Sequence, residues 1–111
     1  MPDFNYSVIV VDVDGTICTD TNGNYLKASP YPQRIIKINS LFDRGVKIIF
    51  MTARGMDSCG GDQRMAHEKY YQFTVDQLNA WGVKFHELYL GKPKADLYID
   101  DKAATLNFFD S

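Results

Sequence analysis

The chain has 111 residues, of which 45% are hydrophobic and 23% are charged, and its formal net charge is −2. This length and composition fit one folded domain with one hydrophobic core, so we predict a single domain over residues 1–111. Without a basic surplus, nucleic acid is not the expected partner. No apolar run approaches the ~20 residues of a membrane span, and the N-terminus lacks the features of a signal peptide, so we expect a cytoplasmic protein without membrane association.

The first elements predicted along the chain are a strand, a hairpin and a helix. Ser7–Val11 is a continuous apolar run, typical of a strand that is buried on both faces. Asn-Gly at positions 22 and 23 is the strongest short hairpin signal, so Ile17–Lys27 is predicted to form a small β-hairpin. Two prolines then precede a helix over Gln33–Arg44, which has apolar residues at helical spacing and a glycine behind it.

The middle of the chain repeats the order of strand and helix. Val46–Met51 is predicted to be a second apolar strand, and the glycine-rich stretch Gly55–Gly61 is predicted to be a loop. A longer helix is predicted over Asp62–Trp81, with apolar residues along one side. Phe85–Leu90 is predicted to be the third strand.

The chain closes with a short strand at Leu97–Ile99 and a short helix over roughly Ala103–Phe109. Because strands alternate with helices, the sequence predicts an α/β fold with right-handed crossovers. We expect a three-layer α/β/α, Rossmann-like core, in which a short parallel sheet has helices on both faces and the β-hairpin forms a flap.

Polar side chains gather where the predicted strands end. In a parallel sheet these ends meet at one edge, and ligands bind there. The residues expected at this edge are Asp12, Asp14, Thr52, Lys92, Asp100 and Asp101. Carboxylates held close together repel one another, so the site needs a cation, and oxygen ligands select a hard ion such as Mg²⁺. The two cysteines, Cys18 and Cys59, lack a metal-binding spacing and are expected to be free thiols.

Four short stretches of sequence lie at these strand ends. They are Asp12-Val13-Asp14-Gly15-Thr16, Thr52 after the second strand, Lys92 in Gly91-Lys92-Pro93, and the pair Asp100-Asp101. In this order they resemble the four motifs of the haloacid dehalogenase (HAD) superfamily of phosphatases, and the match covers nearly the whole chain. The resemblance implies a HAD core and a magnesium-dependent phosphomonoester hydrolase.

The resemblance also implies a role for each motif residue. Asp12 would attack phosphorus and form an aspartyl-phosphate, which replaces one difficult step with two easier ones. Asp14 would act as the general acid and base, and an Asp at this position favours a hydrolase over relatives that retain the aspartyl-phosphate. Thr52 and the backbone N–H of Ala53 would bind phosphate oxygens. Lys92 would hold Asp12 and the phosphate together as a point charge.

The same resemblance implies the metal ligands. They would be Asp12, the main-chain carbonyl of Asp14, and Asp100, with Asp101 binding either directly or through water. Gly15 fits the tight turn that the family needs after the nucleophile, where a side chain would intrude.

Two basic residues near the motifs leave alternatives open. Arg54 either contacts the phosphorylated substrate bidentately or forms a salt bridge to Asp57 or Asp62. Lys94 lies two residues beyond Lys92 and could take the role of the third-motif lysine instead, although the Gly-Lys-Pro context favours Lys92.

The intervals between the motifs leave no room for a cap domain, so the resemblance implies a capless enzyme with an open site. The chain is also similar to small bacterial phosphatases of capsule or surface-sugar synthesis, through Met51–Arg54 and Gly91–Asp96. That similarity implies a phosphorylated sugar or another small metabolite as substrate. A short sheet with unprotected edges also favours a homo-oligomer, in which a neighbouring copy covers the site.

Two other functions stay open at this point. The first is a polynucleotide 3′-phosphatase, because Thr52-Ala53-Arg54 resembles an element of those enzymes. The second is a catalytically silent subunit that binds phosphate and metal. The presence of both Asp12 and Asp14 argues against the silent subunit.

Overall fold

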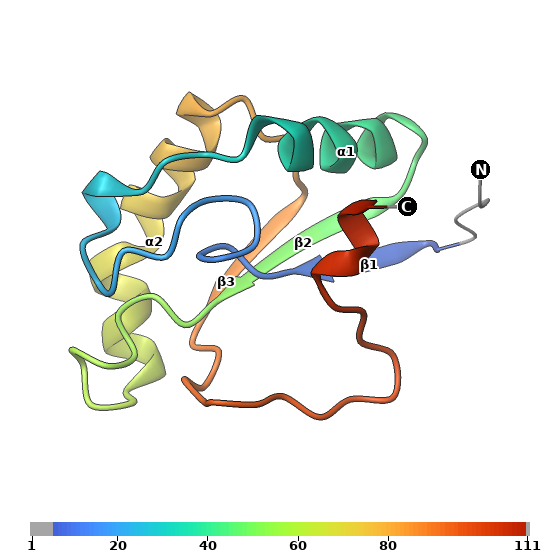
Figure 1. Cartoon of the computed structure of the whole chain (residues 1–111). Helices are drawn as coiled ribbons and strands as arrows, with labels where there is room; N and C mark the ends of the chain where they lie inside the picture. The colour runs from blue at the N-terminus through green and yellow to red at the C-terminus, as the bar shows by residue number, and fades with distance from the viewer. Residues whose placement is uncertain (1–5, 111) are drawn as a thin grey trace.

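The computed structural model describes residues 6–110, and residues 1–5 and 111 of the predicted domain lie outside this part. A parallel sheet of three strands in the order β1-β2-β3 forms the centre of the molecule (Figure 1). The elements along the chain are β1 (Val8–Val11), η1 (Tyr25–Lys27), α1 (Pro32–Asp43), β2 (Lys47–Thr52), α2 (Gln63–Ala80), β3 (Glu87–Leu90) and η2 (Leu106–Asp110), where η denotes a 3₁₀ helix. The chain therefore has a small α/β fold.

The two long helices begin and end close to their predicted bounds because local signals fix their ends. α1 starts at Pro32, whose fixed φ suits the first turn of a helix. At the start of α2 the side chain of Asp62 accepts a hydrogen bond from the N–H of Met65, which caps the helix. The helix residues that are buried at helical spacing are Ile35, Ile38 and Leu41 in α1, and Ala66, Thr74 and Leu78 in α2.

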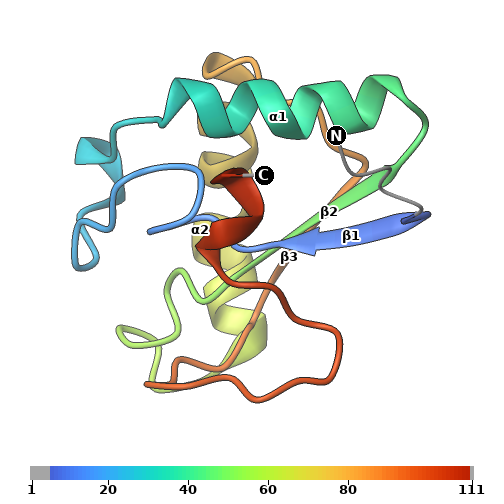
Figure 2. The same ribbon diagram turned by 45° about the vertical axis from the view of Figure 1, so that its right-hand side comes forward.

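The helices α1 and α2 pack on the same face of the sheet (Figure 2). That face carries Ile48 and Phe50, which are fully buried. The opposite face, which we call the open sheet face, carries Val8, Val10 and Tyr89, and these are 52%, 60% and 51% exposed. Two right-handed crossovers that advance in the same direction along a sheet place both helices on one side. The prediction of helices on both faces is therefore wrong for α1 and α2.

The predicted β-hairpin is a loop with a tight turn. Asn22 and Gly23 both have positive φ angles, 57° and 96°, as the Asn-Gly signal predicts. The flanking residues do not form two strands, however, because the segment pairs at isolated bridges alone, in which Cys18 faces Asp14 and Pro30. The short helix η1 occupies the residues behind the turn. The turn prediction is confirmed, and the hairpin prediction is wrong.

The C-terminal part differs most from expectation. The predicted strand Leu97–Ile99 has no strand partner in residues 6–110, and its three residues are 73%, 48% and 92% exposed. It lies in residues 91–105, an open segment between β3 and η2 that we call the arch (Figure 1). The predicted last helix is the short η2, which packs on α1, where the Lys37 ammonium donates to the carbonyl of Phe108. No helix in the described part of the chain is long and apolar enough to cross a bilayer.

Candidate active site

Three strands end at one edge of the sheet, and this edge carries three of the predicted residues. Asp12 directly follows β1, Thr52 is the last residue of β2, and Lys92 lies two residues beyond the end of β3. The backbone N–H of Lys92 donates to the carbonyl of Thr52 over 3.2 Å, which holds the end of β3 beside that of β2. The Lys92 ammonium lies 3.6 Å from Oδ1 of Asp12. This edge therefore brings together a carboxylate that follows one outer strand, β1, and a cation that follows the other, β3.

The carboxyl group of Asp12 is partly buried, and its side chain keeps 34% of its exposure. Burial raises the pKa of Asp12 above its usual value, and the nearby charge of Lys92 opposes the rise. The hydroxyl of Thr16 donates to Oδ2 over 3.3 Å, which also favours the ionised form. The oxygens of Asp12 therefore lie in a fixed orientation beside one cation, with one side open to solvent.

The turn after Asp12 depends on Gly15. Its φ is +82°, and its N–H donates to the carbonyl of Cys18 over 2.8 Å. A Cβ placed on Gly15 would have Cβ of Asp20 as its nearest neighbour at 4.0 Å, so space is not limiting. The backbone conformation, rather than crowding by a side chain, is what requires glycine here.

Asp14 binds Arg54 through both of its oxygens. Nε of Arg54 lies 2.9 Å from Oδ2, and Nη2 lies 2.9 Å from Oδ1. The Arg54 side chain has no exposure, and that of Asp14 has 18%. The predicted salt bridge to Asp57 or Asp62 is therefore wrong, because Arg54 pairs with a residue of the first motif. In this conformation the guanidinium has no exposed surface, and contact with a substrate stays a prediction.

Three further side chains surround this ion pair. The guanidinium of Arg54 lies over the ring of Tyr25 at 4.8 Å, and Nη1 donates to the hydroxyl of Thr74 over 3.4 Å. The thiol of Cys18 lies 3.5 Å from Oδ1 of Asp14. Burial and the neighbouring carboxylate of Asp14 together raise the pKa of Cys18 to about 12. We call these five residues the Arg54 cluster; nothing in the sequence pointed to it, because its members come from four separate segments.

The phosphate-binding residues predicted at the end of β2 differ in whether their hydrogen-bonding groups are already engaged. Thr52 is only 1% exposed, and its hydroxyl accepts a hydrogen bond from the N–H of Arg54 over 3.1 Å. It therefore fixes the turn. Within residues 6–110 the N–H of Ala53 donates no hydrogen bond, so it is available to an anion. Gly55 completes the turn, because a Cβ there would lie 2.5 Å from the ring of Tyr70.

The predicted metal ligands do not come together within one chain. Asp100 and Asp101 lie on the exposed arch, and Asp100 accepts a hydrogen bond from the N–H of Lys102. This bond and the adjacent Asp101 lower the pKa of Asp100. The pair with Arg54 engages both carboxylate oxygens of Asp14 and leaves out its main-chain carbonyl, which is the predicted ligand at this position. Across residues 6–110, no group of three or more His, Cys, Asp or Glu residues is arranged to hold a metal ion.

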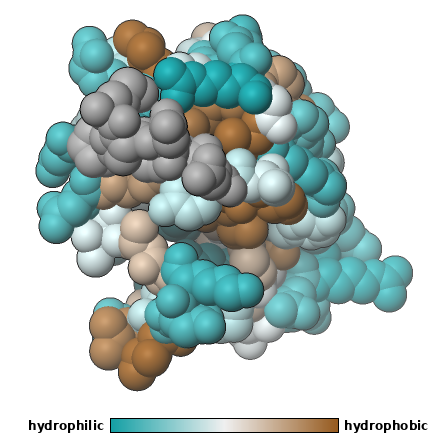
Figure 3. Space-filling model, turned by 90° about the vertical axis from the view of Figure 1, so that its right-hand side faces the viewer, coloured by the Kyte–Doolittle hydropathy of each residue, from teal (hydrophilic) through white to brown (hydrophobic). Residues whose placement is uncertain are grey.

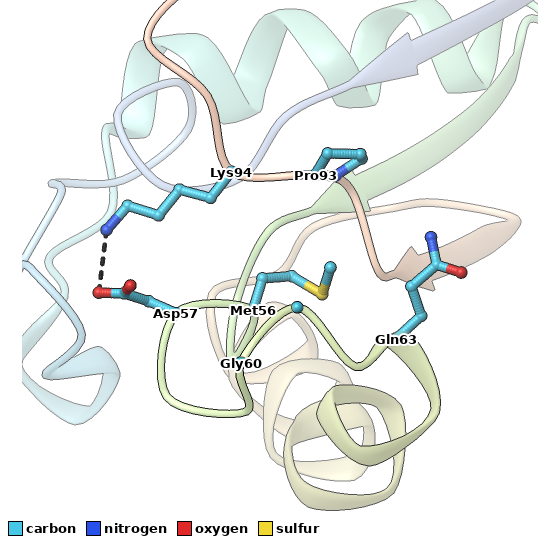
Figure 4. A pocket seen from close by; sticks show the side chains of 7 residues that line it. Met56, Asp57, Gly60, Gln63, Pro93 and Lys94 are labelled. Atoms are coloured by element: carbon cyan, nitrogen blue, oxygen red, sulfur yellow. Dashed lines mark hydrogen bonds and ion pairs between the residues drawn. The ribbon is translucent and has the colours of Figure 1, made fainter.

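A cavity of about 570 Å³ lies beside this edge, between the loop after β2 and the start of the arch (Figure 4). Its lining residues are Met56, Asp57, Gly60, Gly61, Gln63, Pro93 and Lys94. Lys94 reaches across the mouth, where its ammonium lies 3.2 Å from Oδ2 of Asp57 (Figure 4). The lysine beside Asp12 is therefore Lys92, and its rival Lys94 lines the cavity.

No protein-family model and no curated protein matches this chain. Among solved structures, the chain is similar to an MCSG target from Vibrio cholerae, known from a crystal structure. The two chains are 26% identical, and the similarity covers 95% of this chain and 88% of the other, with a TM-score of 0.86. The name of that protein states no function, so the likeness supports the α/β fold described above.

Proposed function

We propose that this protein is a HAD-type phosphomonoester hydrolase that uses Asp12 as its nucleophile. The observation that carries the proposal is the pair formed by Asp12 and Lys92, whose oxygen and nitrogen are 3.6 Å apart at the edge where three parallel strands end. Ligands of parallel sheets bind at this edge. The pair offers a nucleophile and a positive charge for a phosphate, and the N–H of Ala53, which directly follows β2 at the same edge, adds a donor.

In the proposed first step an oxygen of Asp12 forms a bond to phosphorus, and the bond from phosphorus to the substrate oxygen breaks. Lys92 balances the negative charge that builds up on the phosphoryl oxygens. Asp14, after one of its oxygens has turned away from Arg54 and taken up a proton from water, gives that proton to the leaving oxygen. In the second step water attacks the aspartyl-phosphate, Asp14 takes a proton from that water, and phosphate leaves with Asp12 restored.

Both tasks of Asp14 require it to leave Arg54. Its two oxygens are occupied by the guanidinium, and its side chain is 18% exposed. A rotation of the side chain would free one oxygen for the reacting group. The described conformation is therefore a resting arrangement in this proposal, and Arg54 is a positioning residue that holds Asp14 beside the nucleophile.

Mg²⁺ was expected from the sequence, but the acids of a single chain do not fit it. Mg²⁺ prefers octahedral oxygen coordination. Asp12 offers its carboxylate and Asp14 its main-chain carbonyl, because the carboxylate of Asp14 binds Arg54, whereas Asp100 and Asp101 lie on the exposed arch. We therefore derive the steps above from Asp12, Asp14 and Lys92 alone.

The proposed substrate is a phosphorylated sugar or a metabolite of similar size. The cavity beside the edge can take the part of the substrate that leaves, and its mouth carries Lys94 and Asp57. Charged and amide side chains of this kind suit a hydroxyl-rich group.

The test is phosphate release from a panel of phosphorylated sugars, polyols, sugar acids and nucleotides, with Mg²⁺ and with EDTA. Asp12→Asn should lose turnover by orders of magnitude, whereas Asp76→Asn, an exposed control on α2, should keep it. Equal turnover by wild type and Asp12→Asn would refute the proposal. Preference for a 3′-phosphorylated oligonucleotide, weakening steeply with salt, would favour the polynucleotide phosphatase. Phosphate binding without any turnover would favour the silent subunit.

A further inference from the structure

The outer edge of β1 has no strand beside it in residues 6–110. β1 pairs only with β2, so its second row of backbone N–H and C=O groups faces outward. Val8 and Val10 expose 52% and 60% of their surface on the open sheet face next to this edge. An uncovered apolar edge strand is a template for pairing with another segment. Natural folds rarely leave such an edge bare, so a partner for it is expected.

A matching apolar segment stands in the arch. Leu97, Tyr98 and Ile99 are the residues whose sequence predicts a strand, and Ile99 is 92% exposed. Hydrophobic side chains also gather on a protrusion that stands off from the body of the molecule (Figure 3). Within residues 6–110, neither this segment nor the outer edge of β1 therefore has a strand partner.

The arch is anchored to its own chain at both ends. At its start the N–H of Lys92 donates to the carbonyl of Thr52. Within the arch the hydroxyl of Tyr98 donates to the carbonyl of Pro93. At its far end η2 packs on α1. Between these anchors the arch stands away from the sheet of its own chain in both ribbon views (Figures 1 and 2). An apolar strand held outward in this way is placed to meet a second copy.

We propose that two copies of this chain exchange strands, so that residues 97–101 of each add to the free edge of β1 in the other. The exchange is reciprocal, and it therefore uses both the segment and the edge on each copy and closes as a symmetric dimer. Backbone hydrogen bonds along the new strand pair supply the contact, as in other cases of strand addition. Leu97 and Ile99 leave water in the same step.

A parallel orientation has a consequence for the active site. Asp100 and Asp101 follow the segment directly, as Asp12 follows β1. In parallel pairing both acids of one copy arrive at the edge that carries Asp12 of the other copy. The acidic set that one chain fails to assemble would then be completed by two. This consequence rests on the proposed function, whereas the strand exchange does not.

The first test is the mass of the full chain in solution, measured by size-exclusion chromatography with light scattering. We expect a dimer. Val10→Lys and Ile99→Lys should each give a monomer, because each places a charge in the exchanged pair, and circular dichroism checks that the variants stay folded. Ile36→Lys changes a residue of α1 that is 58% exposed and outside both surfaces, so it should remain a dimer. A monomeric wild type at all concentrations would overturn the exchange.

The second test uses complementation. Asp12→Asn and the double variant Asp100→Asn/Asp101→Asn are coexpressed with different tags, and the mixed dimer is isolated through both tags. Each variant alone should be inactive, whereas the mixed dimer should show about half of wild-type activity, because one of its two sites is complete. An active wild type with an inactive mixed dimer would mean that the arch serves its own chain. A dimer without activity in the wild type would leave the exchange standing and remove the proposed hydrolase.

Discussion

The guanidinium of Arg54 binds both oxygens of Asp14, at 2.9 Å each, inside the protein. The pair joins the turn after β1 to the turn after β2, and these turns carry Asp12 and Ala53. Because a buried charge needs its partner, the two turns cannot move apart without a large cost. The position of the nucleophile is thereby coupled to that of the nearby backbone donor.

Loss of Arg54 should be strongly destabilising. Arg54→Met leaves the carboxylate of Asp14 without its partner, and breaking a buried pair on one side costs about 3–5 kcal/mol. Urea unfolding followed by circular dichroism measures the change. Arg64→Met is the matched control, because Arg64 pairs with Glu68 on the surface, where 88% of its side chain is exposed, and such pairs add little. Similar losses in the two variants would contradict the buried pair.

Asp12→Asn should be more stable than wild type at neutral pH. Burial raises the pKa of Asp12 above 3.8 in the folded chain, so the folded state holds this proton more tightly than the unfolded state does. The stability that comes from the bound proton is complete below pH 3.8 and is lost as the pH rises through the raised pKa. Thermal unfolding of both proteins from pH 3 to pH 8 should show a gap that opens with pH. A difference in stability between the two proteins that stays constant with pH would show that burial does not raise the pKa of Asp12.

Lys92 and Lys94 should differ sharply in their effect on turnover. Lys92→Met removes the cation 3.6 Å from Asp12, and we expect a loss of roughly 10²–10³-fold in kcat, as for other single groups that stabilise an oxyanion. Lys94→Met removes the cation at the mouth of the cavity, so it should change KM more than kcat. Steady-state kinetics on the preferred substrate separates the two effects. An equal loss of kcat in both variants would mean that the lysines are interchangeable.

The two thiols should react at very different rates in the folded protein. Cys18 is fully buried with a pKa of about 12, so it stays protonated at pH 8, whereas Cys59 is only half-buried in the loop after β2. The thiolate is the reactive form. Titration with a thiol reagent should therefore modify one cysteine per folded chain and both in urea. Rapid modification of both in the native protein would contradict the closed packing around Arg54.

The sequence predicted elements best where local signals act alone. The helix expected over Asp62–Trp81 is observed over Gln63–Ala80, because Asp62 caps it and apolar side chains recur on one face. The Asn-Gly turn also formed as predicted, since both residues tolerate positive φ. A turn signal says nothing about whether its flanks pair, and for that reason the hairpin did not follow from it.

Features that depend on distant parts of the chain were not predictable. The partner of Arg54 lies forty residues earlier in the chain, so spacing could not identify it. The face on which the helices pack depends on the direction of the crossovers. At Leu97–Ile99 the apolar run indicated a strand but not the edge that it would join. The nearness of Asp12 to Lys92 was predictable, because both follow strands of one parallel sheet.

The covalent intermediate is the most direct test of the central claim that Asp12 is the nucleophile. Wild type, Asp12→Asn and Asp14→Asn are quenched in acid during turnover of the preferred substrate, and intact-protein mass spectrometry is followed by peptide mapping. The account predicts one added phosphoryl group on Asp12 in the wild type and none in Asp12→Asn, whereas Asp14→Asn should slow both the formation of the intermediate, which lacks its acid, and its breakdown, which lacks its base. Phosphate release without any phosphoryl group on Asp12, or with the group on another side chain, would contradict it.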